Sequence, residues 1–163
     1  MKRGGYAEGK VRNWLTAYKH NVIGFTFNRL LDAHSSHGRT SVEQPGDYQW
    51  FLNTGLKFTL GNESIVRTWT RNGVIEVKEV AHAYRLPVQN FGIDQVGRMQ
   101  IRALAGSEPL VLVCFRPPDE KPCWRTAPLE FFQERPSKAG SWDFREIDAY
   151  THCDDLLHMF IGK

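Results

Sequence analysis

Residues 76–78, Glu-Val-Lys, place a carboxylate and an ammonium group two positions apart inside the β-branched stretch NGVIEVKEV. Alternate side chains of a β-strand point to the same face, so Glu76 and Lys78 would share one face of a strand. Charges beside a buried sheet cost free energy unless they compensate each other, stay solvated or bind a charged ligand. The stretch therefore indicates either a reactive site or a cross-strand ion-pair network of Glu76, Lys78 and Glu79 on an exposed edge.

A second carboxylate stands upstream, at the start of another expected strand. Asp47 follows the turn signal Pro45-Gly46 and opens DYQWFLN. If the two strands are neighbours, Asp47 and Glu76 converge at one end of the sheet and form a site for Mg²⁺, for which Mn²⁺ should substitute. Lys78 would lie beside the metal, where an ammonium can orient an attacking water or stabilise charge on a phosphate. The backbone carbonyl of Val77 is a further candidate metal ligand.

The hydrophobic pattern predicts the elements that must position these residues. A first amphipathic helix is expected over 6–19 and a second over 91–106, closed by Gly106. Strands are expected over 22–31, 47–53, 74–80, 110–115 and 123–127, with 110–115 apolar enough to be covered on both faces. A short helix should follow Pro128, and the tail from residue 138 should add a strand and a helix packed on the core. This alternation predicts an α/β fold, a mixed central sheet flanked by helices.

The length of 163 residues fits a single domain. We expect a core over 1–132, with 54–71 as a hairpin insert turning at Gly61-Asn62, and a C-terminal extension over 133–163. No apolar run is long enough for a membrane span, and MKRGGYAEGK is not followed by a signal-peptide core. The three cysteines form no CxxC pair, which favours a reduced, cytoplasmic protein.

Charge is distributed unevenly along the chain. Residues 1–40 contain seven Lys and Arg against two acids, whereas residues 117–163 contain six against nine. A basic N-terminal third is compatible with a polyanionic partner such as DNA, or with a soluble protein of uneven surface charge. The candidate phosphate-binding residues are Lys2, Arg3, Lys10, Arg12, Arg29 and Arg39.

Pro45-Gly46-Asp47 followed by Glu76-Val77-Lys78 resembles the PD-(D/E)xK signature of metal-dependent nucleases, whose fold is restriction-endonuclease-like. The first half departs from that pattern, because Gly46 separates the proline from the aspartate. The flanks resemble RecU-like and archaeal Hjc-like Holliday junction resolvases. GGYAEGKVRNWL resembles their opening helix, and this implies that Glu8 completes the metal site.

Two further segments extend this resemblance. RLPVQNFGIDQVGRMQIRALAGSEPLVLVCF is similar to the RecU-like segment that follows the ExK strand, which implies that Gln95 lies beside the active site. NRLLDAHSSHGR resembles the loop before the metal aspartate in the archaeal enzymes, which makes Ser35 and Ser36 candidates for phosphate contact. CWRTAPLEFFQ resembles their late strand and helix. The matches run in order over roughly residues 4–132.

The resemblance implies a Mg²⁺-dependent endodeoxyribonuclease, a homodimeric Holliday junction resolvase that makes paired symmetric nicks in four-way DNA junctions. Catalytic roles would fall to Glu8, Asp47, Glu76, Lys78 and Gln95, and metal ligation to Asp47, Glu76, Val77 and Glu8. DNA binding would involve Lys10, Arg12, Arg29, Ser35, Ser36 and Arg39.

Three alternatives remain at this point. One is a PD-(D/E)xK nuclease that acts on flaps, nicks, mismatches or DNA ends. Another is a DNA-binding accessory protein without catalysis, although a site that has lost its activity would not need to retain Asp47, Glu76 and Lys78. The third is a zinc site built from HSSH (34–37) or from His152 and His158, whose spacings match no common zinc pattern.

Overall fold

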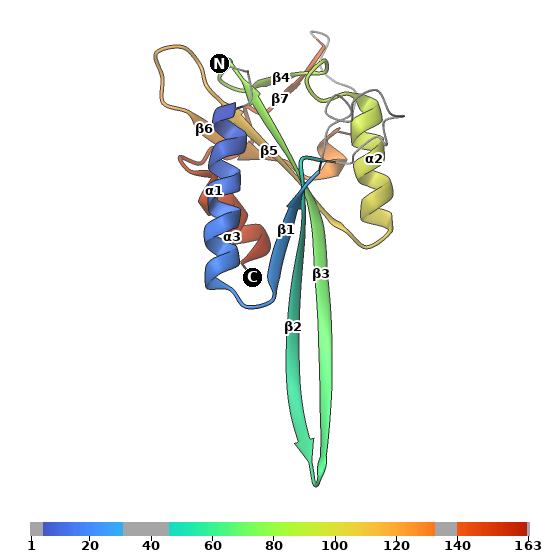
Figure 1. The fold of residues 1–163 in the computed structure, drawn as a ribbon. Coiled ribbons are helices and arrows are strands. Elements are labelled where there is room, and N and C mark those ends of the chain that lie inside the picture. The colour runs from blue at the N-terminus through green and yellow to red at the C-terminus, as the bar shows by residue number, and fades with distance from the viewer. Residues whose placement is uncertain (1–4, 31–45, 133–139, 163) are drawn as a thin grey trace, which may run out of the picture.

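The computed structural model describes residues 5–30, 46–132 and 140–162, and it centres on one mixed five-stranded sheet (Figure 1). The sheet has the order β1-β2-β3-β5-β6, and a second, two-stranded sheet joins β4 to β7. The strands are β1 (Phe25–Arg29), β2 (Tyr48–Leu60), β3 (Glu63–Val80), β4 (Arg85–Pro87), β5 (Glu108–Phe115), β6 (Cys123–Thr126) and β7 (Ser141–Asp143). The helices are α1 (Gly5–Asn21), α2 (Ile93–Leu104), the 3₁₀ helix η2 (Leu129–Phe132) and α3 (Cys153–Ile161).

Strand pairing brings the two predicted acidic segments together. β1, β2 and β3 form an antiparallel meander in which Tyr48 pairs with Ile75. β5 then pairs with β3 in parallel, so Glu76 stands opposite Val111 and Lys78 opposite Val113. A parallel pair needs a long crossover connection, and here it passes through β4 and α2. β3 is thus an internal strand, paired on both sides, that carries the predicted reactive residues.

The sheet is covered on both faces. α1 and α3 lie on one face, where Val11, Leu15 and Leu157 pack against Ile75 and Val77. The other face carries α2, η2 and the β4–β7 pair. The apolar run of β5 alternates between the two clusters, with Leu110 and Leu112 on the α1 face and Val111 and Val113 on the α2 face. The predicted fold class, an α/β domain with a mixed central sheet flanked by helices, is confirmed.

β2 and β3 continue beyond the packed domain as a long hairpin (Figure 1). The ladder runs unbroken to Leu60 and Glu63 and turns at Gly61-Asn62, as predicted. Gly61 has φ +61°, a left-handed conformation that glycine adopts without the steric cost of a Cβ. The prediction of a strand ending at residue 53 was too short, because 54–71 extends the same two strands. The proposed division of the chain at residue 132 stays a prediction.

Local sequence accounts for the ends of α2 and for the form of the tail. Gly106 has φ +93°, and its N–H binds the Ala103 carbonyl, which closes α2 as expected. After Pro128 the chain forms a 3₁₀ helix. Only Ser141–Asp143 of the predicted tail strand is a strand; Tyr150 adds an isolated bridge to Trp124. No helix in the described ranges is long and apolar enough to cross a membrane.

The three cysteines are free thiols. Cys114 and Cys153 are buried in the α1-side cluster, and burial raises the pKa of each thiol to about 12. A thiol with such a pKa stays protonated and behaves as a small apolar side chain.

Candidate active site

Asp47 is fixed between the ends of three strands. Its backbone N–H donates to the Ile75 carbonyl at 2.8 Å, and its carbonyl accepts from the Leu30 N–H at 2.8 Å. Its carboxylate atom Oδ2 accepts a hydrogen bond from the Val77 N–H at 2.6 Å. The Asp47 side chain thus takes a position that a ladder carbonyl would occupy if β2 began earlier. Asp47 and Glu76 are brought to the same sheet end, as the sequence predicted.

Gly46 explains why the proline and the aspartate are not adjacent. It is buried, and a Cβ built on it would lie 2.9 Å from the Ile75 carbonyl oxygen. Real Cβ atoms essentially never come that close, and the contact is with backbone, which moves only together with the strand. The glycine therefore lets the chain approach β3 closely enough for Asp47 to reach Val77.

A Gly46→Ala variant should separate the chain from β3 and displace Asp47. We expect a loss of about 1–3 kcal/mol in the free energy of unfolding, typical of overpacking, together with a loss of any activity that depends on Asp47. Urea unfolding measures the first effect. Gly97→Ala is a matched control, because a Cβ there meets no atom within 4 Å. Equal behaviour of the two variants would contradict the close-approach role.

Glu76 is buried on the α2 face, with a relative exposure of 2%. It forms an ion pair with Lys78 and a side-chain hydrogen bond with Gln95 of α2. The Lys78 Nζ atom also lies 5.7 Å from the centroid of the Phe91 ring, a cation–π contact. The predicted sharing of one face by Glu76 and Lys78 is confirmed, and Gln95 is brought to the same cluster. An exposed-edge network is wrong, because β3 is internal and Glu79 points to the opposite face.

Burial holds both carboxyls toward the protonated form, and for Asp47 the charge of Glu76 acts in the same direction. Desolvation, followed by the charge of Glu76, raises the pKa of Asp47 from 3.8 to about 7, against the Val77 hydrogen bond and the Lys78 charge. Desolvation also raises the pKa of Glu76, while Lys78, Gln95 and Arg98 act in the opposite direction. Two carboxyls with raised pKa values in one buried site are typical of functional sites.

The Val77 carbonyl completes a set of hard oxygen donors. The N–H and C=O of one strand residue point to the same side, and the Val77 N–H points to Asp47. The Val77 carbonyl therefore points to the side of β3 where Asp47 lies, just before the first residue of β2. Two carboxylates and a carbonyl fit Mg²⁺, which keeps several waters and is commonly held by one or two carboxylates plus substrate phosphates.

Glu8 lies near this pair without joining it. It stands in the first turn of α1, and its charge contributes to the raised pKa of Asp47. Its carboxylate forms an ion pair with Arg29 at 3.0 Å, and its backbone carbonyl accepts from the Tyr48 hydroxyl at 3.4 Å. Within the described ranges, no group of three His, Cys, Asp or Glu side chains is close enough to hold a metal ion. The role of Glu8 as a metal ligand stays a prediction.

The DNA-binding candidates are only partly described. Lys10 and Arg12 are exposed on α1, and Arg29 is exposed at the end of β1, paired with Glu8. His152 and His158 are exposed near the two ends of α3. The remaining candidates lie outside the described residues: Lys2, Arg3, Ser35, Ser36, Arg39 and the HSSH motif.

The sequence did not predict two residues on the α2 side of the cluster: Arg98, which lies near Glu76, and Phe91, which contacts Lys78. Arg98 contributes a positive charge near Glu76, and it lies three residues after Gln95, which is one helical turn. Because this spacing places Gln95 and Arg98 on one face of the helix, the prediction of Gln95 beside the site could have been extended to Arg98. Phe91 precedes α2, and nothing in its sequence context distinguishes it from an ordinary core residue.

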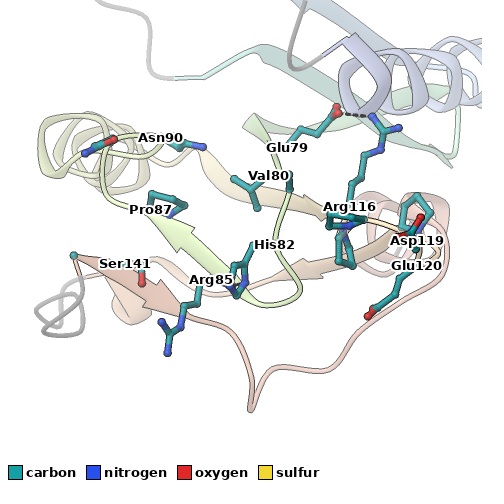
Figure 2. A pocket seen from close by; sticks show the side chains of 16 residues that line it. Glu79, Val80, His82, Arg85, Pro87, Asn90, Arg116, Asp119, Glu120 and Ser141 are labelled. Carbon is teal, nitrogen blue, oxygen red and sulfur yellow. Dashed lines mark hydrogen bonds and ion pairs between the residues drawn. The ribbon is translucent and has the colours of Figure 1, made fainter.

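A cavity of about 950 Å³ opens beyond the carboxyl ends of the parallel strands β3 and β5 (Figure 2). Glu79 and Arg116 form an ion pair at one end of it, and His82 and Arg85 line another part. Asp119 and Glu120 add negative charge on the side of the β5–β6 loop. Its walls therefore carry both signs of charge, and it begins one residue beyond Lys78 on β3.

No protein-family model matches this sequence, and no curated protein matches it. Among solved structures, the chain is similar to Hjc, a Holliday junction resolvase of the archaeal hyperthermophile Archaeoglobus fulgidus. The identity is 20%, the match covers 83% of this chain and 87% of that chain, and the TM-score is 0.45. A likeness at this level carries no functional argument.

Proposed function

We propose that this chain is a metal-dependent endonuclease that hydrolyses DNA phosphodiesters, of the Holliday junction resolvase type. The observation that carries the proposal is the pairing of half-buried Asp47 with buried Glu76 at one sheet end, with Lys78 and Gln95 bound to the same cluster. A protein that only binds DNA gains nothing from two desolvated carboxyls with raised pKa values, whereas a hard cation compensates both charges.

Each residue has a distinct role in this proposal. Asp47, Glu76 and the Val77 carbonyl would hold Mg²⁺, and Glu8 would supply a further carboxylate from α1. The bound metal would lower the pKa of a water and offset charge on the phosphate. Lys78 would orient the attacking water or a phosphate oxygen. Gln95 would hold the Glu76 carboxylate in place through its side-chain amide.

Four-way junctions are the proposed substrate, on the strength of the ordered sequence resemblance to RecU-like and Hjc-like resolvases. Phosphate contacts from Lys10, Arg12 and Arg29 would give salt-dependent binding with little sequence preference. Two symmetric incisions require two sites, which a C₂ homodimer supplies. Three large apolar side chains of α2 are exposed, a surface that a second copy would cover: Ile93, Ile101 and Leu104.

Cleavage of matched DNA substrates tests the proposal. A four-way junction, a fork, a linear duplex and a single strand would each be incubated with Mg²⁺ and with EDTA, beside a Glu76→Ala variant. We expect paired symmetric nicks in the junction alone, lost with EDTA and in the variant. Cutting of every substrate would keep the metal site and reject junction selectivity. Tight binding without cutting would reject catalysis and favour an accessory role.

A further inference from the structure

Glu79 lies on the back of the strand that carries the proposed catalytic residues. It follows Glu76 by three positions, so its side chain points to the α1 face and away from Glu76 and Lys78. Its Oε2 atom accepts the Ala7 N–H at 2.8 Å, and its Oε1 atom accepts from the Arg116 guanidinium at 2.6 Å. Both carboxylate oxygens are thus used within the protein, and the Glu79 side chain is 12% exposed.

The contact with Ala7 fixes the start of α1. The first N–H groups of a helix have no partner inside the helix, and a carboxylate there is also favoured by the helix dipole. Arg116 adds a second link, because its guanidinium lies 4.4 Å from the centroid of the Tyr6 ring while it binds Glu79. Figure 2 shows the Glu79–Arg116 pair reaching toward the helix.

Glu8 is the residue after Ala7, and its own carbonyl is bound by the Tyr48 hydroxyl at 3.4 Å. The first turn of α1 is therefore held at two successive residues, by β3 through Glu79 and by β2 through Tyr48. These two contacts fix the position on α1 from which the Glu8 side chain extends. Asp47 is the residue before Tyr48, so the hydrogen bond from Tyr48 to Glu8 also fixes the position of Glu8 relative to Asp47.

From this geometry we propose that Glu79 is a positioning residue: through the Ala7 N–H it holds Glu8 near Asp47. The inference rests on the function proposed above and adds how its third carboxylate is placed. Because Glu76 and Glu79 belong to one strand, the catalytic face and the anchor on its back move as a unit. Glu79 itself touches no reacting atom.

Mn²⁺ binding, measured by titration calorimetry on the full chain, tests this role independently of cleavage. Glu79→Ala should raise the Mn²⁺ Kd about 10-fold or more, the usual effect of losing a residue that orients a ligand. Glu79→Gln should rescue part of this loss, because its amide oxygen can still accept the Ala7 N–H. In a Glu8→Ala background, Glu79→Ala should have no further effect, since residues acting through one another are not additive.

Glu108→Ala is the matched control. Glu108, like Glu79, is paired with an arginine; it accepts two hydrogen bonds of 2.9 Å each from Arg71, at the opposite end of β5 from Arg116. The Glu108→Ala variant should be less stable than the wild type and should leave the Mn²⁺ Kd unchanged. An unchanged Kd in Glu79→Ala, an equal rise in the Glu8→Ala background, or an equal rise in Glu108→Ala would each overturn the proposal.

Two further results keep the test decisive. If Glu79→Ala does not fold, Glu79→Met replaces it, because methionine keeps the bulk of the side chain but offers no oxygen to the Ala7 N–H. Glu79→Met should raise the Mn²⁺ Kd more than Glu79→Gln does, and the reverse order would overturn the role. Wild-type protein that neither binds Mn²⁺ nor cleaves DNA would reject the proposed function and this inference together. Wild-type binding with Glu79 variants unchanged would reject the positioning role alone.

Discussion

Replacement of Asp47 by Asn is expected to stabilise the metal-free protein at pH 8 and to reduce DNA cleavage by orders of magnitude. Burial, with repulsion from Glu76, raises the pKa of Asp47 from 3.8 to about 7. The folded state thus binds this proton more tightly than the unfolded state does. The stability contribution of Asp47 is full below pH 4 and is lost as the pH rises to about 7. Asn keeps an oxygen for the Val77 N–H and carries no charge.

Urea unfolding in EDTA at several pH values measures this effect. Wild type should lose up to about 4 kcal/mol from this group between pH 4 and pH 8, and Asp47→Asn should remove most of that slope. Cleavage should fall roughly 10³-fold, by analogy with the loss of other groups that stabilise developing charge. The exposed Asp148 provides the control variant Asp148→Asn. An unchanged slope in Asp47→Asn would refute the raised pKa.

Protons and metal would compete for the same carboxyls, which gives wild type a pH dependence of its own. At a fixed, limiting Mg²⁺ concentration, activity should rise as the pH increases through about 7, because Asp47 must lose its proton to bind the ion. Raising Mg²⁺ should shift this rise to lower pH.

Strand periodicity was sufficient to predict how the central charged residues are arranged. Alternation alone placed Glu76 and Lys78 on one face, and the apolar run 110–115 correctly indicated a strand buried on both faces. The convergence of Asp47 with Glu76 needed only the assumption that their strands are neighbours, which the β2–β3 hairpin satisfies. These features are local, or depend on one pairing, so the sequence contains the information.

Other features depend on contacts between distant positions that no local pattern specifies. The partner of Glu79 is the backbone N–H of Ala7, 72 positions away, and any residue type could supply it. Glu8 was predicted as a metal ligand, yet its carboxylate is paired with Arg29. Whether Glu8 pairs with Arg29 or with a cation depends on whether a cation is bound at Asp47 and Glu76, and the residue types alone do not determine this.

Lys78→Met should be the most damaging single change in the Glu76 cluster. Lys78 is the largest influence that lowers the pKa of Glu76 against burial. Without that ammonium, the pKa of a carboxyl that is only 2% exposed should rise further. Removing one partner of a buried ion pair costs about 3–5 kcal/mol. Loss of the group that orients the water should reduce cleavage by roughly 10²–10⁴-fold.

The residual activity should separate a catalytic role for Lys78 from a purely structural one. A protonated Glu76 must lose its proton before it can bind the metal, so the pH–rate profile of Lys78→Met should shift to higher pH. Lys121→Met removes an exposed lysine and should shift nothing. The double variant Glu76→Gln/Lys78→Met should recover stability, because no buried charge is left unpaired, while remaining inactive. Recovered stability without cleavage would show that the ion pair is retained for its chemistry; a double variant that still cleaves DNA would place the reaction elsewhere in the protein.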